Sequence, residues 1–157
     1  MLAISPQPLR PDASRAAVEV PVRAILETAG SVTPGRWKYV YVHHSRSLPP
    51  PATTTDHFIL TDDGLQATEL WTKQQAAGSP TGSGSVDPGC VSVCVVGDFD
   101  RSLPTPTLQR RLARLIDSLQ SNLRMSSRCL IMLDQPNSPA GVGRHFPTAD
   151  FRSQLLQ

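Results

Sequence analysis

The residues of this chain best able to do chemistry are its four histidines and the acidic side chains near them. His43 and His44 stand next to Ser45, and twelve residues separate His43 from Asp56. This grouping admits a Ser-His-Asp nucleophile as one interpretation. Adjacent residues of a strand point to opposite faces, however, and no Gly-x-Ser-x-Gly elbow accompanies the serine. The pattern therefore does not favour nucleophilic catalysis.

The three cysteines are an odd number and include no Cys-x-x-Cys pair, so they indicate no disulfide framework. Cys90 and Cys94 are four residues apart in an apolar run, which places both on one face of a strand. A pair of small buried thiols is favoured over a pair of metal ligands, and Cys129 stands alone. The segment Gly78–Gly89 lacks a Gly-Lys-Ser/Thr ending, so we expect a mobile surface loop rather than a phosphate-binding loop.

The strands that must position these residues follow from alternating apolar side chains. Residues 37–43 predict a strand in which Trp37 and His43 share a face. Residues 57–61 and 65–71 predict a hairpin around the favoured turn Asp62-Asp63-Gly64. Two further β-prone runs predict short buried strands at 91–96 and 129–133.

Helical signals lie between and outside these strands. Thr105 followed by Pro106 predicts a helix start, and leucines at helical spacing continue to Leu123. Residues 1–14 are expected to form a flexible tail. Residues 15–35 predict a helix, which begins near Pro21, and the turn that follows it. Residues 149–156 predict a short final helix. The order of elements predicts an α/β (α+β) fold, with a central mixed β-sheet flanked by helices.

Four segments carry a family resemblance by their order: Trp37–Ser45, His57–Gly64, Val91–Phe99 with Pro106–Gln109, and Gly143–Pro147. They resemble, in this order, motifs of the type-2 N-acetylmuramoyl-L-alanine amidases and peptidoglycan recognition proteins. The first segment ends like the family's hydrophobic-His-His-Ser, and the second resembles its Asp-Gly hairpin. The third resembles its Gly-Asp-Phe and, one residue shorter, its Pro-Thr-x-x-Gln, and the fourth its Phe-Pro. The resemblance covers about 36–157 and implies an amidase-like domain over that range.

The resemblance also implies a zinc site and shows it to be degenerate. Family members cut the amide between N-acetylmuramic acid and L-alanine, with zinc held by two His and one Cys. Matched residue by residue, the first ligand falls on His43. The second falls on Met132 or Leu133, and the Cys ligand falls on Gly141. The resemblance therefore predicts that two of three zinc ligands are lost and that no zinc cofactor is bound in the family's way.

Other positions of the family's site have changed as well. The supporting Tyr is replaced by Asp56 and the His of a Gly-Ala-His loop by Pro80. The segment between His43 and Asp56 is short and contains three consecutive prolines, where the family fits a helix along its groove. We expect a wider and shallower groove.

Two interpretations remain for the retained histidine. A His/Asp/His set of His43, Asp56 and His145, with Asp134 nearby, would suit a borderline metal as a rebuilt site. The simpler interpretation is that His43 is hydrogen-bonded to Asp56 in a shallow cleft. His57 is expected to point to the opposite face of the sheet as a satisfied, partly buried side chain.

The sequence thus supports three hypotheses on function. The first is a non-catalytic amidase-like domain that binds peptidoglycan or a related glycan-peptide. The second is an active zinc amidase with a rebuilt metal site, and the third is a protein-interaction module that reuses the fold. The candidate groove residues are His43, His44, Asp56, Arg144 and His145.

Charge and hydropathy exclude other partners. The net charge is +2, and the arginines are dispersed apart from three on the predicted long helix, so we expect no nucleic-acid partner. No segment approaches the ~20 apolar residues of a membrane span, and residues 1–15 carry no apolar signal-peptide core. The family acts at the cell envelope, but this chain shows no signal that directs it there.

Overall fold

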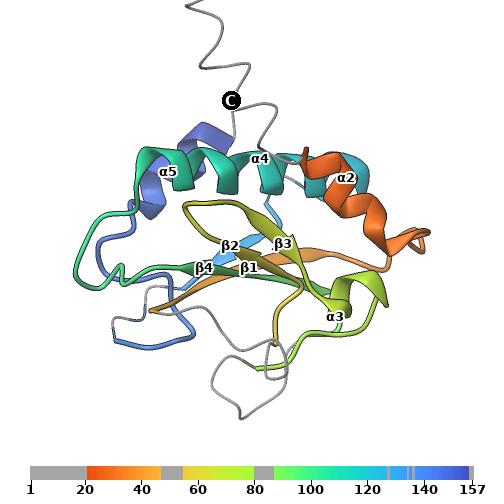
Figure 1. Cartoon of the computed structure of the whole chain (residues 1–157), viewed down its shortest axis with the longest axis horizontal. Coiled ribbons are helices and arrows are strands. Elements are labelled where there is room, and N and C mark those ends of the chain that lie inside the picture. Colours follow the sequence, from red (N-terminus) through yellow and green to blue (C-terminus); the bar gives the residue numbers. More distant parts are fainter. Residues whose placement is uncertain are drawn as a thin grey trace, which may run out of the picture.

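A computed structural model of the chain describes residues 21–46, 55–79, 87–126, 128–133, 135 and 137–155. Over these residues the strands form one five-stranded sheet of order β3-β2-β4-β1-β5 (Figure 1). β3 is antiparallel to β2, and all other neighbours are parallel. The strands are β1 (Tyr39–Ser45), β2 (Phe58–Leu60), β3 (Leu65–Ala67), β4 (Cys90–Val96) and β5 (Leu130–Met132). The α/β fold with a mixed sheet is therefore confirmed.

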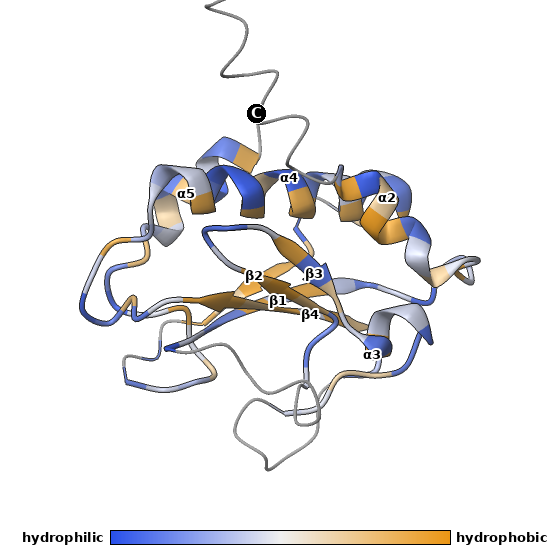
Figure 2. Ribbon diagram, viewed as in Figure 1, coloured by the Kyte–Doolittle hydropathy of each residue, from blue (hydrophilic) through white to orange (hydrophobic). Residues whose placement is uncertain are grey.

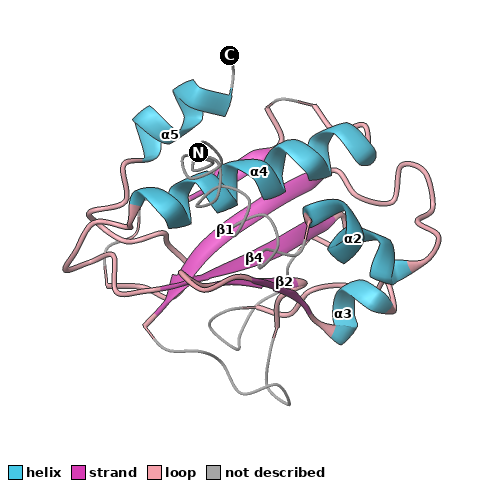
Figure 3. Ribbon diagram, turned by 45° about the horizontal axis from the view of Figure 1, so that its top comes forward, coloured by secondary structure: helices cyan, strands magenta, loops and turns pink. Residues whose placement is uncertain are grey.

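Three helices lie over one face of the sheet (Figures 1 and 3). They are α2 (Val22–Leu26), which continues into the 3-10 turn η1 (Glu27–Ala29), α4 (Pro106–Asn122) and α5 (Thr148–Leu155). A fourth short helix, α3 (Glu69–Thr72), follows β3. The side of α4 toward the sheet is hydrophobic, and so are the strands beneath it (Figure 2).

The two faces of the sheet differ in chemistry because strand side chains alternate between them. The helix-covered face carries the main apolar core, which includes Val42, Val93 and Leu115. The opposite face of β1 and β4 carries Tyr41, His43, Ser92 and Cys94, all buried. A polar and sulfur-containing layer therefore lies beneath the sheet, on the face that bears His43.

Two of the predicted strands have different limits in the structure. β3 ends at Ala67, and the residues expected to continue it to Trp71 form α3. The chain turns at Thr68, whose carbonyl accepts hydrogen bonds from the amides of Trp71 and Thr72. This turn buries the Trp71 ring and lets its Nε1 donate to the carbonyl of Leu26 at 3.0 Å. Packing of one large indole thus overrides the local β pattern.

The first strand is displaced by two residues toward its carboxyl end. It spans Tyr39–Ser45, so Trp37 precedes it rather than sharing a regular face with His43. The Trp37 ring instead contacts His57 and Trp71 at centroid distances of 4.8 and 6.1 Å. The tail 1–14, most of the loop 78–89, Pro80 and Asp134 lie outside the described residues.

Helix α4 begins as the sequence predicts. Thr105 has extended backbone angles, and its side-chain oxygen accepts a hydrogen bond from the amide of Leu108. The same hydroxyl lies 2.6 Å from a carboxylate oxygen of Asp62 and donates to it, which ties the β2–β3 turn to the helix start.

Replacing Thr105 by alanine is expected to lower the free energy of unfolding by about 1 kcal/mol, the usual cost of losing an N-cap. Urea denaturation followed by circular dichroism measures this loss. Thr105→Ser keeps the hydroxyl and should retain most of the stability. Equal losses in the two variants would contradict a capping role.

Candidate functional site

His43 is held by a buried hydrogen-bond network on the face of the sheet opposite α2, α4 and α5. Its Nε2 lies 2.6 Å from Oδ1 of Asp56, and the Ser92 hydroxyl donates to the same oxygen at 2.6 Å. Asp56 precedes β2, so the network joins β1, β4 and the entry to β2. The side chains of His43 and Asp56 are only 5% and 3% exposed. Both interpretations of this histidine place Asp56 beside it, so the contact agrees with both and does not choose between them.

Cys94 and Tyr41 flank this network. Cys94 pairs with His43 across the parallel β1–β4 ladder, and its thiol is buried. Burial, followed by the nearby Asp56 carboxylate, raises the pKa of the Cys94 thiol far above its usual range. The Tyr41 ring stacks on His43 at a centroid distance of 5.6 Å, and its hydroxyl donates to the carbonyl of Ala140. Burial, then Asp56, raises the pKa of Tyr41 to about 12.

The register of β5 separates the two residues that the resemblance matches to the family's second zinc ligand. Met132 pairs with Val42 and belongs to the core on the helix-covered face. Leu133 follows β5, and continuing the register by one residue places it beside His43 on the other face. Of the two residues left open by the sequence, Leu133 therefore occupies the position beside His43, and an aliphatic side chain offers no ligand atom.

The third ligand position also lies near His43. The carbonyl of Gly141 accepts a hydrogen bond from the His44 amide at 3.0 Å, so this loop runs alongside the end of β1. A Cβ at Gly141 would lie 2.6 Å from the carbonyl oxygen of Gln135, so the backbone leaves no room for a side chain there. The loop keeps its place in the fold but carries no ligand.

These residues do not fit the family's zinc site. Hydrolytic zinc needs three protein ligands and an open position, and only His43 remains of that set. Its Nε2 already contacts Asp56 at 2.6 Å, and its ring is buried. His145, expected as a ligand of a rebuilt site, is exposed and joins none of the metal-capable groups within the described residues. A rebuilt site that uses His145 is thus unsupported.

A second polar cluster anchors the loop that follows β5. His44 is buried; its Nδ1 lies 3.1 Å from the carbonyl oxygen of Gly97, and its Nε2 lies 3.5 Å from the carboxylate of Asp100. Asp100 accepts the amides of Arg144 and Asn137 at 2.9 and 3.0 Å. The Arg144 hydrogen bond is the main reason that the pKa of Asp100 lies below its usual range. The cluster therefore fixes the loop against the ends of β1 and β4.

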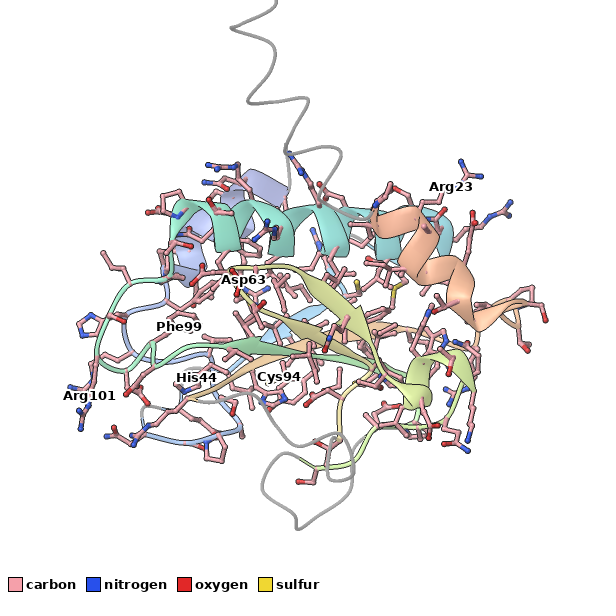
Figure 4. All side chains as sticks on the ribbon, viewed as in Figure 1. Arg23, His44, Asp63, Cys94, Phe99 and Arg101 are labelled. Atoms are coloured by element: carbon pink, nitrogen blue, oxygen red, sulfur yellow. The ribbon has the colours of Figure 1, made fainter. Side chains whose placement is uncertain are left out.

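Exposed cationic side chains surround these strand ends. Arg46 and Arg101 are 63% and 79% exposed, and the Nε of each lies 3.6 Å from Asp98. Arg101 extends outward at one end of the molecule (Figure 4). Arg144 and His145 are exposed on the anchored loop. These four residues form a cationic rim at the carboxyl ends of β1 and β4.

The five candidate groove residues thus divide into two layers. His43, His44 and Asp56 are buried, at 4%, 4% and 2% exposure, whereas Arg144 and His145 are exposed. The shallow cleft expected around His43 from the sequence stays a prediction. A cavity of about 640 Å³ lies elsewhere, between residues 32–38 and the end of α4, and none of the five lines it.

His57 is a fully buried structural residue. Its Nε2 donates to the carbonyl of Gln75 at 2.7 Å, and its Nδ1 accepts the amide of Ser92 at 2.9 Å. Burial lowers the pKa of His57, which favours the neutral ring that these two bonds require.

Sequence reasoning missed Ser92, Cys94, Asp98 and Asp100 as neighbours of the two histidines. Alternation along β4 placed Cys90 and Cys94 on one face, but no local signal showed that His43 shares it. The parallel register between β1 and β4 supplies that information, and it joins segments about fifty residues apart.

No helix within the described residues is long and apolar enough to cross a membrane.

Comparison with known proteins tests the fold. By sequence, no protein-family model and no curated protein matches the chain. Two solved amidases of Clostridium intestinale URNW are similar in structure. The endolysin N-acetylmuramoyl-L-alanine amidase LysCS gives a TM-score of 0.55 and 17% identity over 77% of this chain and 84% of that chain. The N-acetylmuramoyl-L-alanine amidase LysC gives the same TM-score and identity over 77% and 86%.

A third similar structure is PGRP-Hd from Alvinella pompejana. It has a TM-score of 0.52 and 15% identity over 82% of this chain and 93% of that chain. All three likenesses cover most of both chains, at identities that bear on the fold alone. The chain therefore has an α/β fold similar to that of N-acetylmuramoyl-L-alanine amidases and PGRP-Hd.

Proposed function

We propose that this chain is a non-catalytic amidase-like domain that binds peptidoglycan or a related glycan-peptide. The observation that carries the proposal is the combination of an amidase-like fold with ligand positions that cannot hold the family's zinc. Gly141 and Leu133 stand where a thiolate and an imidazole are needed, and the backbone at Gly141 admits no side chain. Without those ligands the domain lacks the means to polarise the amide or activate water.

The binding surface is the cationic rim formed by Arg46, Arg101, Arg144 and His145. In open α/β sheets, ligands bind at the carboxyl ends of parallel strands, and the rim occupies that edge of β1 and β4. Peptide stems and lactyl groups carry carboxylates and carbonyls, which guanidinium groups bind through charge-assisted hydrogen bonds. The buried His43, His44 and Asp56 then support this surface from within.

A pull-down with insoluble peptidoglycan tests this proposal. We expect the wild-type chain to be retained above an unrelated control protein. Arg101→Ala/Arg144→Ala should weaken retention by at least about tenfold, since each hydrogen bond to a charged group contributes about 1.5–3 kcal/mol. Arg23→Ala/Arg110→Ala is the matched control, because it removes the same charge from two exposed helix positions, of which Arg23 lies at the opposite end of the molecule from Arg101 (Figure 4).

Three results would contradict the proposal. Wild-type retention no greater than that of the unrelated protein would favour an interaction module without a cell-wall ligand. Equal losses in both double variants would show non-specific charge attraction. Release of new amino termini from peptidoglycan by the zinc-loaded chain would favour the active amidase.

A further inference from the structure

Three potential metal ligands of different chemistry converge beneath the sheet. An imidazole nitrogen of His43, a carboxylate oxygen of Asp56 and the thiol sulfur of Cys94 all lie within 4.8 Å of one another. The three residues are 4%, 2% and 1% exposed. They come from β1, the entry to β2 and β4, so a shared ion would join three segments of the sheet.

A second observation points to a ligand at this cluster. Nδ1 of His43 is buried and has no hydrogen-bond partner within the described residues, whereas its Nε2 contacts Asp56. A buried polar atom left without a partner costs about 1–3 kcal/mol, and such atoms in native proteins commonly mark a water or an ion.

We propose that His43, Asp56 and Cys94 form a buried site for a borderline metal ion of the zinc class. Nitrogen, oxygen and sulfur donors together suit zinc and disfavour magnesium and calcium, which prefer oxygen alone. Binding displaces the thiol proton of Cys94; the imidazole of His43 keeps its proton on Nε2, and the thiolate, the carboxylate and Nδ1 bind the ion. Because the ion binds Nδ1, the ring nitrogen without a partner, the hydrogen bond between Nε2 and Asp56 must break for the carboxylate to reach the same ion.

This site differs from the family's zinc site in two of its three donors. It keeps His43, but its other ligands lie at β2 and β4 instead of at the end of β5 and in the loop at Gly141. Because all three side chains are buried, we expect an ion here to join three segments of the sheet rather than meet a substrate, with a water in its fourth position. The inference does not rest on peptidoglycan binding, and each can fail without the other.

Metal analysis and cobalt spectroscopy of the intact chain test the site. After loading and removal of free metal, we expect about one zinc per chain and a higher melting temperature than in chelator. Cobalt in place of zinc should give a near-ultraviolet sulfur-to-cobalt charge-transfer band. Cys94→Ser should lose this band and weaken zinc binding by more than about 100-fold, because changes outside the ligand shell already cost about 10–100-fold.

Cys90→Ser is the matched control, since Cys90 lies on the same strand and face but outside the three-residue cluster. It should keep the band and the bound zinc. Much less than one zinc per wild-type chain, or no sulfur-to-cobalt band, would overturn the proposal. So would a band that persists in Cys94→Ser and disappears in Cys90→Ser. Even if a variant does not fold, the zinc content and the cobalt band of the wild-type chain still test the proposal.

Discussion

Replacing Asp56 by alanine is expected to lower the free energy of unfolding by about 2–5 kcal/mol. The change leaves both the His43 Nε2 and the Ser92 hydroxyl buried without their shared acceptor. Each unsatisfied buried group costs about 1–3 kcal/mol, and a small cavity adds to the loss. Urea denaturation in the presence of a chelator measures the effect without a contribution from bound metal.

Asp63→Ala is the control for Asp56→Ala. Asp63 is an exposed carboxylate in the nearby β2–β3 turn, so its loss should change stability by less than about 0.5 kcal/mol. Similar effects of the two substitutions would show that the buried network contributes nothing specific. A second variant, Ser92→Ala, removes only one hydrogen bond to Asp56, so its loss in the free energy of unfolding should lie between those of Asp56→Ala and Asp63→Ala.

Replacing Gly143 by alanine is expected to destabilise the chain by about 2–5 kcal/mol. Gly143 has a φ of +98°, and a Cβ there would lie 2.6 Å from both the carbonyl carbon and the Cβ of Phe99. Positive φ costs an alanine about 1–2 kcal/mol, and the forced shift of packed backbone adds about 1–3 kcal/mol. The shift would also disturb the hydrogen bond from the His145 amide to the Phe99 carbonyl.

Gly35→Ala separates the two contributions in this prediction. Gly35 also has a positive φ, +77°, but nothing lies within 4 Å of a Cβ built there. Gly35→Ala should lower the free energy of unfolding only by the cost of the positive φ, about 1–2 kcal/mol, and should retain wild-type binding to peptidoglycan. Gly143→Ala should bind less, because Arg144 and His145 follow directly. If Gly143→Ala loses no more stability than Gly35→Ala, the close approach of the Gly143 backbone to Phe99 is refuted.

Local sequence patterns predicted much of the fold, and particular residues show why. Thr105 and Pro106 carry the start signal of α4, and the structure confirms both the N-cap and the proline at the first turn. The alternating apolar run of β4 also forms as predicted. Trp71 is the counterexample, since its local pattern favours a strand and its burial against Leu26 requires the turn into α3.

The candidate site was predictable only in part. The contact between His43 and Asp56 was anticipated from the family resemblance, and the structure places Nε2 of His43 2.6 Å from Oδ1 of Asp56. The part played by Cys94 was not anticipated, because the sequence shows which residues share a strand face but not which strands are neighbours. The rebuilt-site interpretation needed His145 near His43, and the exposed position of His145 on the anchored loop could not be inferred from spacing.

The sequence by itself determined the fold class and the long helix, and through the family resemblance it predicted that the family's zinc ligands are missing at Gly141 and at Leu133 or Met132. These conclusions depend on residue types and short-range periodicity, which need no knowledge of distant contacts. Only the tertiary structure decided that Leu133 rather than Met132 lies beside His43, that His43, His44 and Asp56 are buried, and that Cys94 joins them. Those outcomes depend on the parallel register of β4, β1 and β5, which pairs segments far apart in the chain and is fixed by packing of the whole sheet.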